Sequence, residues 1–336
     1  MKPKEHRLRL YGLDNAEPEA GKQPIIHHLP VIGEAMKPFS SRPGSAFLPA
    51  EPNSSSIRRM IGFLFLALLF TASVQAGSGE RVGPSCLKAE AFVWLGPGNH
   101  PLPFRSSLGI EEFLRSAEVI SMEVIPTGIT RPMKVTLEKD GIRMKAVFRN
   151  VDRYRRKWKT KNGLKMNFYD RYIFECAAYE LGKLLGVTNI PPVVLRTING
   201  EKGSLQAWLE NSFTEGHRIR EKIAPPDARK WLYQVQQMRV FDNLIYNDDR
   251  NQGNILIDED WNLWMIDETR AFRTIPDLRD PENIHYCERN FWQRLVDVDE
   301  NLLKETLQDS GLLGPGEMRT LLKRREKLIH HIKGLI

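Results

Sequence analysis

The sequence contains little cysteine. Its three cysteines, Cys86, Cys176 and Cys287, lie far apart in a chain of 336 residues, and there is no CxxC pair. This spacing argues against a zinc site built from thiolates, and the eight histidines show no ligand spacing. If the chain is exported, Cys86 and Cys287 could form a disulfide. Three separate thiols are the alternative.

Signatures of nucleic-acid-binding modules are also missing. There is no zinc-finger spacing, no RNA-recognition signature and no clear helix-turn-helix pattern. The net charge of +7 is compatible with weak attraction to phosphate, acidic protein or an anionic membrane. We therefore expect no nucleic acid among the partners.

Long apolar runs are scarce, and the one candidate, Ile61–Ala76, is shorter than the roughly 20 residues that a membrane-spanning helix needs. It follows Arg58 and Arg59 and ends in small residues, which is the layout of a secretory signal peptide. Residues 60–76 are thus predicted to export the chain to the periplasm or the medium. The alternative is a signal anchor that holds the chain at the membrane.

The stretch before this segment is polar. Residues 1–59 are rich in Pro, Ser, Gly and charged side chains, a composition typical of disorder. They are either a disordered extension or the product of a wrongly assigned start, with translation beginning at Met36 or Met60.

The rest of the chain predicts an α+β protein. Residues 77–116 are expected to form a linker or lead-in with a short helix from 110. Alternating residues and two-residue turns then predict strands, and helical spacing predicts helices. The expected strands are 119–125, 133–139, 142–149, 191–196, 203–208, 254–257 and 263–266; the expected helices are 167–185, 227–246, 288–296, 300–310 and 316–333. The basic stretch 153–165 is expected to be a loop.

The segment YNDDRNQGNILIDEDWNLWMIDETRAFR contains the residues best suited to chemistry. Asp249 and Asn254 lie on the loop after the long helix, and Asp267 follows the second short strand. Phosphoryl transfer needs a carboxylate that orients the attacking hydroxyl, together with oxygen ligands that hold a metal ion on the phosphates. A short hairpin between Asn254 and Asp267 would bring these two side chains together.

The upstream strands offer a second pair of residues. Lys145 lies on the third expected strand and Glu175 on the following helix. A lysine held by a helix carboxylate is suited to contact the α- and β-phosphates of a nucleotide.

These segments resemble atypical protein kinases, namely the bacterial relatives of the secretory-pathway kinases of the Golgi casein-kinase type and the phosphatidylinositol 3/4-kinase-like group. The likeness rests on 249–273 and, more loosely, on FECAAYEL, LGV with IPP, and GSLQ. It implies a two-lobed fold with a small antiparallel β-rich N-lobe at 117–211 and a mainly helical C-lobe at 212–336. It also implies ATP with Mg²⁺ or Mn²⁺.

The resemblance assigns roles to single residues. Asp249 would be the catalytic base, and Asn254 and Asp267 the metal ligands. Lys145 would contact phosphate with Glu175 as its partner. The nucleotide site would be completed by Gly128 in the phosphate-covering loop and Gln206, near Trp208, at the hinge that meets adenine.

The sequence departs from typical kinases at three motifs. There is no GxGxxG, Asn247-Asp248-Asp249 stands where HRD is usual, and Asp267-Glu268-Thr269 replaces DFG. Atypical kinases and degenerate pseudokinases share such departures.

Four functions follow as alternatives. The first is a kinase acting on a hydroxyl of a protein, lipid or sugar, with the basic 153–165 stretch attracting an acidic substrate or a membrane surface. The second is a nucleotidyl or glutamyl transferase, and the third a pseudokinase binding module. The fourth is an α+β protein without a nucleotide site, which is tested by whether Lys145, Glu175 and Asp267 converge in space.

Overall fold

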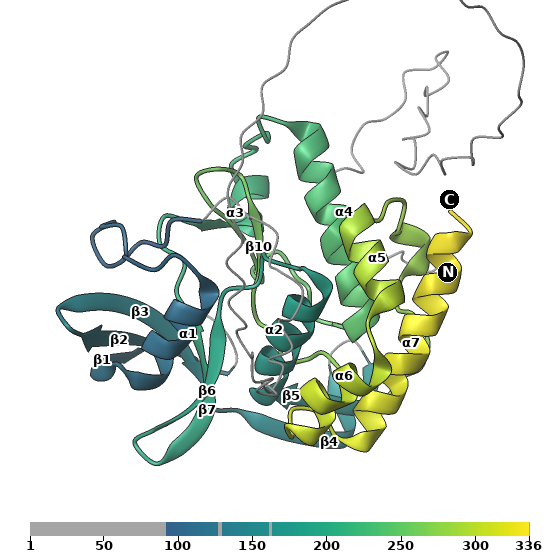
Figure 1. The fold of residues 1–336 in the computed structure, drawn as a ribbon, viewed down its shortest axis with the longest axis horizontal. Helices are drawn as coiled ribbons and strands as arrows, with labels where there is room; N and C mark the ends of the chain where they lie inside the picture. The colour runs from purple at the N-terminus through teal and green to yellow at the C-terminus, as the bar shows by residue number, and fades with distance from the viewer. Residues whose placement is uncertain (1–91, 127–129, 161–162, 336) are drawn as a thin grey trace, which may run out of the picture. The chain divides into compact units, whose positions relative to one another are not determined.

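The computed structural model describes residues 92–126, 130–160 and 163–335, which Figure 1 shows as coloured ribbon. The expected signal segment 60–76, Cys86 and Gly128 lie outside the described residues, so the predictions made for them stay predictions. Among the described residues, no helix combines the length and the apolar character needed to cross a membrane.

The first half of the described chain forms a five-stranded antiparallel sheet in the order β1-β2-β3-β7-β6. The expected strands and turns are confirmed: both two-residue turns, Asp140-Gly141 and Asn199-Gly200, have positive φ at both positions, as tight hairpins require. The strand bounds are β1 (Glu118–Val124), β2 (Met133–Lys139), β3 (Ile142–Arg149), β6 (Val193–Ile198) and β7 (Glu201–Ala207).

The two faces of this sheet differ. On one face, alternate residues such as Leu137, Met144 and Phe148 are buried in a core that they share with helix α1 (Ser107–Ser116). The opposite face of β3 carries Lys145, Val147 and Arg149, because successive strand residues point to opposite sides. This second face therefore carries the polar residues of interest.

The basic stretch is not the loop that we expected. It forms a two-stranded antiparallel hairpin, β4 (Asp152–Thr160) and β5 (Gly163–Arg171), which delays helix α2 to Ile173–Leu185 instead of a start at 167. The described β4 residues from Asp152 to Lys157 are exposed. Strands with both faces in solvent lack the apolar alternation by which strands are recognised in a sequence.

The second half is mainly helical, and the predicted long helix, short hairpin and C-terminal helices are confirmed. A third strand, β8, which we did not predict, completes the small sheet β10-β9-β8. The elements of this second half are β8 (Phe213–Thr214), α3 (Glu215–Arg220), α4 (Ala228–Ile245), β9 (Ile255–Ile257), β10 (Leu263–Met265), η1 (Pro281–Asn283), α5 (Arg289–Asp297), α6 (Glu300–Lys304), the π-helical η2 (Glu305–Asp309) and α7 (Pro315–Lys333).

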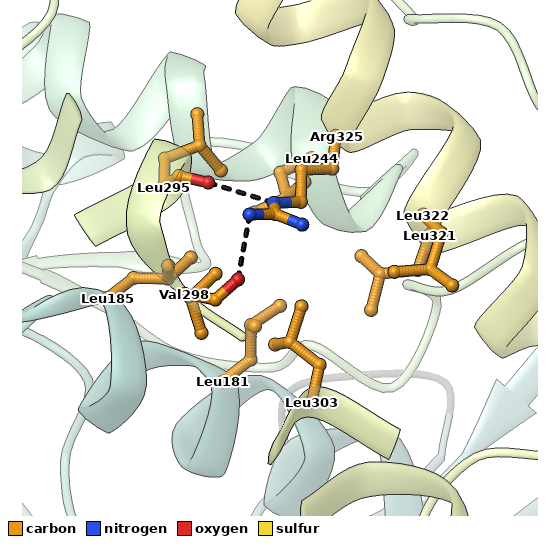
Figure 2. A pocket seen from close by; sticks show the side chains of 9 residues that line it. All are labelled: Leu181, Leu185, Leu244, Leu295, Val298, Leu303, Leu321, Leu322 and Arg325. Carbon is orange, nitrogen blue, oxygen red and sulfur yellow. Dashed lines mark hydrogen bonds between the residues drawn. The ribbon is translucent and has the colours of Figure 1, made fainter. Parts of the chain in front are cut away.

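A second apolar core joins α2 to these C-terminal helices. This core contains a cavity of about 10 Å³. Figure 2 shows the side chains that line it, most of them leucines from several helices. Arg325 closes one side, where it donates hydrogen bonds to the carbonyls of Leu295 and Val298. The space is at the lower limit for one water molecule and is apolar, so we assign it to imperfect packing and not to a ligand.

Candidate active site

The loop between α4 and β9 places the first candidate residues. Helix α4 ends at Ile245, and the next residue, Tyr246, has the left-handed conformation (φ 52°), which turns the chain sharply into this loop. The side chain of Asn247 accepts from the backbone N–H of Asp249 at 3.0 Å. Asn254 donates its Nδ2 to the carbonyl of Asp249 at 3.0 Å. Because Nδ2 is engaged in this way, Oδ1 is the atom of Asn254 that can face a cation.

The β9–β10 hairpin brings Asn254 and Asp267 together, as the sequence suggested. Directly beyond the hairpin, the N–H of Ile266 donates to the carbonyl of Asn254 at 3.2 Å. Asp267 itself has φ 62°, an uncommon conformation outside glycine that gives a reason to suspect function. Its Oδ1 accepts from the hydroxyl of Thr269 at 2.8 Å, which fixes the carboxylate.

A buried guanidinium, that of Arg250, holds this loop and this hairpin in place. It donates to Asp242 on α4 at 3.0 Å and to Glu268 at 2.8 Å. It also donates to the carbonyls of Asn254 and Ile266, both at 2.8 Å. Arg250 therefore fixes the backbone on both sides of the Asn254–Asp267 pair, a role that no sequence pattern indicates.

The predicted pairing of Lys145 with Glu175 is replaced by another pair. The Nε of Arg149, at the end of β3, lies 3.5 Å from Oε1 of Glu175 and 4.0 Å from Oδ1 of Asp267. Lys145 instead binds Glu210, with 2.9 Å between Nζ and Oε1. Lys145 and Arg149 project from the same face of β3, and the later start of α2 places Glu175 beside the far end of the strand.

The backbone around Arg149 is tightly constrained. A Cβ added to Gly203 on the neighbouring strand would lie 2.4 Å from the carbonyl oxygen of Arg149. Only glycine fits there without a shift of the β3 backbone. The GSLQ segment that contributed to the family resemblance therefore includes a residue that sets the position of Arg149.

Gln206 lies in the same buried cluster. Its Oε1 accepts from Nη1 of Arg149 at 3.4 Å, so the side chain points toward the charged residues of the cleft face. Its expected contact with adenine, together with that of Trp208, stays a prediction.

The sequence did not reveal a link between Asp249 and the hairpin. The Nη1 of Arg270 lies 2.8 Å from Oδ2 of Asp249. Its Nη2 lies 3.6 Å from Oδ2 of Asp170, which is near the end of β5. Its guanidinium also stacks on the ring of Phe168. Asp170 could not be recognised because its segment was assigned to the start of a helix.

Burial dominates the electrostatics of this cluster. It raises the pKa of Glu175 from 4.5 to about 8, even though Arg149 works in the opposite direction and Glu268 and Asp267 add to the rise. Burial likewise raises the pKa of Glu268 and of Asp170. Arg149 is thus surrounded by carboxyl groups whose charged forms are costly in free energy to bury close together.

The residues present fit a metal ion with a nucleotide. Buried polar atoms of the cluster have no hydrogen-bond partner: Nε of Arg149, both carboxylate oxygens of Glu175 and Nε2 of Gln206. Asn254 and Asp267 offer the oxygen ligands that Mg²⁺ or Mn²⁺ prefers, and Mg²⁺ often takes its remaining ligands from phosphate and water. The described residues hold no group of three or more His, Cys, Asp or Glu side chains placed for a metal by themselves.

We predict that Arg250→Met lowers the free energy of unfolding by about 3–5 kcal/mol, because it leaves the buried carboxylates of Asp242 and Glu268 without their cation. Urea denaturation measures the change. Arg250→Lys should not restore stability, since a lysine cannot reproduce the fork of donors. The matched control is Arg220→Met at a side chain that is 69% exposed, with a change within about 0.5 kcal/mol. Equal stability of the two methionine variants would contradict the role of Arg250.

A second prediction concerns pH. Because the pKa of Glu175 is raised in the folded protein, the folded state binds the proton more tightly than the unfolded state. The resulting stabilisation is complete below the ordinary pKa of 4.5 and is lost as the pH rises toward about 8. Melting curves across this window should show a fall in stability that is smaller in Glu175→Gln. An identical pH dependence of both proteins would show that Glu175 does not titrate in this way.

Comparison with known proteins gives a result for the fold only. No protein-family model matches the chain, and no curated protein is significantly similar to it. The crystal structure of the Golgi casein kinase superposes with a TM-score of 0.50 and 15% sequence identity, covering 68% of this chain and 74% of that kinase.

Two further solved structures are similar with lower scores. The Golgi casein kinase with Mn and ADP bound has a TM-score of 0.48 at 16% identity, covering 67% of this chain and 75% of that one. The kinase CtkA of Helicobacter pylori has 0.44 at 10% identity, covering 66% and 98%. An antiparallel sheet followed by helices, together with the match to the Golgi casein kinase, shows that this chain has an atypical protein-kinase-like fold.

Proposed function

We propose that this protein is an ATP- and metal-dependent phosphotransferase that moves the γ-phosphate to a hydroxyl group. The observation that carries the proposal is the convergence of two sets of residues. Asp249, Asn254 and Asp267 are joined by backbone and side-chain contacts, and Asp267 lies within ion-pair distance of the Arg149 of the β-rich sheet. A fold without a nucleotide site gives no reason for this costly burial of charge.

Each of these residues has a chemical task in the proposal. Asp249 orients the acceptor hydroxyl and takes its proton. Asn254, through Oδ1, and Asp267 hold Mg²⁺ or Mn²⁺. The bound metal neutralises the negative charge of the phosphates.

We assign the phosphate contact to Arg149 and not to Lys145. Arg149 has the helix carboxylate, Glu175, beside it, whereas Lys145 is engaged by Glu210. A guanidinium presents a planar fork of donors that suits phosphate oxygens. Glu175 would then hold Arg149 in place, which is the task first expected of it toward Lys145.

A non-catalytic nucleotide-binding module is a second candidate, and one contact favours it. Arg270 forms an ion pair with Asp249 at 2.8 Å, so the proposed base is engaged by a cation of its own chain. Catalysis requires that an acceptor hydroxyl reach Asp249 beside Arg270 or displace it.

The basic hairpin favours an anionic acceptor. Residues that face each other in an antiparallel pair project to the same side, and Arg153 and Arg155 face Asp170 and Phe168. Both of these β5 residues contact Arg270, which is bound to Asp249. The exposed guanidinium groups of Arg153 and Arg155 are thus on the side of the hairpin that faces the proposed base, where acidic groups flanking an acceptor hydroxyl could bind.

The proposal predicts that the full chain turns over ATP with Mg²⁺ or Mn²⁺. In Asp267→Ala the turnover rate should fall by about 10²-fold or more, because one of the two metal ligands is removed. Asp277→Ala is the matched control, since this carboxylate pairs with Lys327 at the surface. An acidic protein and a neutral sugar, offered in parallel, report which acceptor class is used.

The outcomes separate the alternatives. Transfer of AMP in place of phosphate would indicate a nucleotidyl transferase. Stabilisation by ATP and metal without turnover would indicate the binding module. If the protein neither turns over ATP nor is stabilised against heat by ATP and metal, the phosphotransferase proposal fails.

A further inference from the structure

Helix α2 presents a polar stripe that faces two partners. Glu175, Tyr179 and Lys183 recur at every fourth position and therefore lie on one side of the helix. Glu175 is beside Arg149, as described above. Tyr179 donates its hydroxyl to Oε1 of Glu111 on α1 at 2.9 Å, and Lys183 donates Nζ to the same oxygen at 3.2 Å. The same side of α2 thus carries the site carboxylate and the contact with α1.

Glu111 is a buried anion with its donors on α2. Its residue surface is only 2% exposed. Burial alone raises its pKa, but the charge of Lys183 and the hydrogen bonds from Tyr179 and Arg115 outweigh it, and the net pKa is lowered. Glu111 is therefore ionised at neutral pH. Burial raises the pKa of Tyr179, so its phenol keeps the proton that it donates.

Helix α1 is in turn fixed to the β-rich sheet. Ile110 and Leu114 are fully buried in the core that α1 shares with the sheet, where the helix packs on β6, β7 and β2. Arg196 on β6 donates to the carbonyls of Leu114 at 2.6 Å and Ala117 at 2.5 Å, which satisfies the C-terminal end of α1. The position of α1 therefore follows the sheet.

The apolar residues of α2 belong to another core, which α2 shares with the C-terminal helices and with Val193 of β6. The helix also packs directly on β6 and β7, so Glu111 adds a polar contact to an apolar one. Glu111 therefore provides a buried polar link between a helix of one core and a helix of the other. A shift of α2 relative to the sheet would separate Glu175 from Arg149, and it would also have to break the contacts of Glu111.

We propose that Glu111 is a positioning residue for phosphoryl transfer: it holds α2 in the rotation that places Glu175 beside Arg149. The inference rests on the proposed function and adds a residue outside the candidate site. It makes α1, which the sequence assigned to a lead-in, part of the catalytic module.

The test compares Glu111→Gln with Arg115→Gln in the full chain. Glutamine keeps the size of Glu111 and removes its charge. Arg115 touches the same carboxylate from α1 itself and is half-exposed, so its loss leaves the link between the helices intact. We expect kcat for ATP turnover to fall by about 10- to 100-fold in Glu111→Gln, since small displacements of a site have effects of this size. The Arg115→Gln value should stay within about twofold of the unchanged protein.

A double variant shows whether Glu111 acts through Glu175. On a Glu175→Gln background, the Glu111→Gln change should lower kcat by less than about twofold, because the group that it positions is already gone. A loss as large as on the unchanged background would show that the two residues act independently, and it would overturn the proposal.

Cys176 gives a readout that does not need catalysis. Its thiol is buried, directly after Glu175 in α2. Alkylation by iodoacetamide, followed peptide by peptide, should accelerate at Cys176 by about tenfold in Glu111→Gln and not in Arg115→Gln, because freeing α2 opens its surroundings locally. The half-buried Cys287 should react at an unchanged rate in all three proteins.

These rates distinguish the possible failures. If alkylation accelerates at Cys176 alone but the protein shows no ATP turnover, the link between the helices is supported and the phosphotransferase proposal fails. Unchanged Cys176 rates and unchanged kcat overturn the proposal. If alkylation of Cys287 also accelerates, Glu111→Gln loosens the whole fold, and the variant Tyr179→Phe, which removes one donor to Glu111, is then decisive. A smaller fall in kcat and a smaller rise in Cys176 alkylation in Tyr179→Phe support the positioning role. No change in either quantity overturns it.

Discussion

The buried guanidinium of Arg250 is the interaction on which the candidate site depends. It connects α4, through Asp242, with the backbone of Asn254 and Ile266 and with the carboxylate of Glu268. Breaking a buried ion pair is strongly destabilising, because the remaining charge has no compensation. The loop before β9 and the segment after β10 are therefore held together by one side chain that contacts neither nucleotide nor acceptor in our proposal.

A second set of charges extends this arrangement to the sheet. Arg149 lies between Glu175 of α2 and Asp267 beyond β10, so one cation of the sheet is within ion-pair distance of carboxylates from two separate elements. Several buried polar atoms around it, including both carboxylate oxygens of Glu175 and Nε2 of Gln206, have no hydrogen-bond partner. Unsatisfied buried groups of this kind need an explanation, and a bound metal–nucleotide complex provides one.

Much of the fold was predictable, because it is encoded locally. The strands β2 and β3 alternate between apolar and polar residues around an Asp-Gly turn, and the glycine at position 186 ends α2 in the left-handed conformation. Strand β4 was missed because its exposed, mostly charged residues carry no apolar period, and part of β5 was assigned to the start of a helix. That error moved the expected start of α2.

The site was predictable in part, for a related reason. Asp249, Asn254 and Asp267 lie close in sequence, and their short hairpin fixes how they meet. Lys145 and Arg149 are equivalent by alternation alone, and only the three-dimensional position of α2 decides which one lies beside Glu175. The contacts of Arg270 with Asp170 and of Glu111 with Tyr179 join distant segments, and no local pattern predicts them.

The most direct test of this account is a calorimetric titration of ADP in the presence of Mn²⁺ into the full chain, into Arg149→Gln and into Lys145→Gln. The account predicts binding that weakens by about tenfold or more in Arg149→Gln, because a charge-assisted contact with phosphate is lost. Lys145→Gln should bind within about threefold of the unchanged protein. Weakening by the Lys145 change alone, or no binding by the unchanged protein, would contradict the assignment of the cluster around Arg149 as the phosphate site.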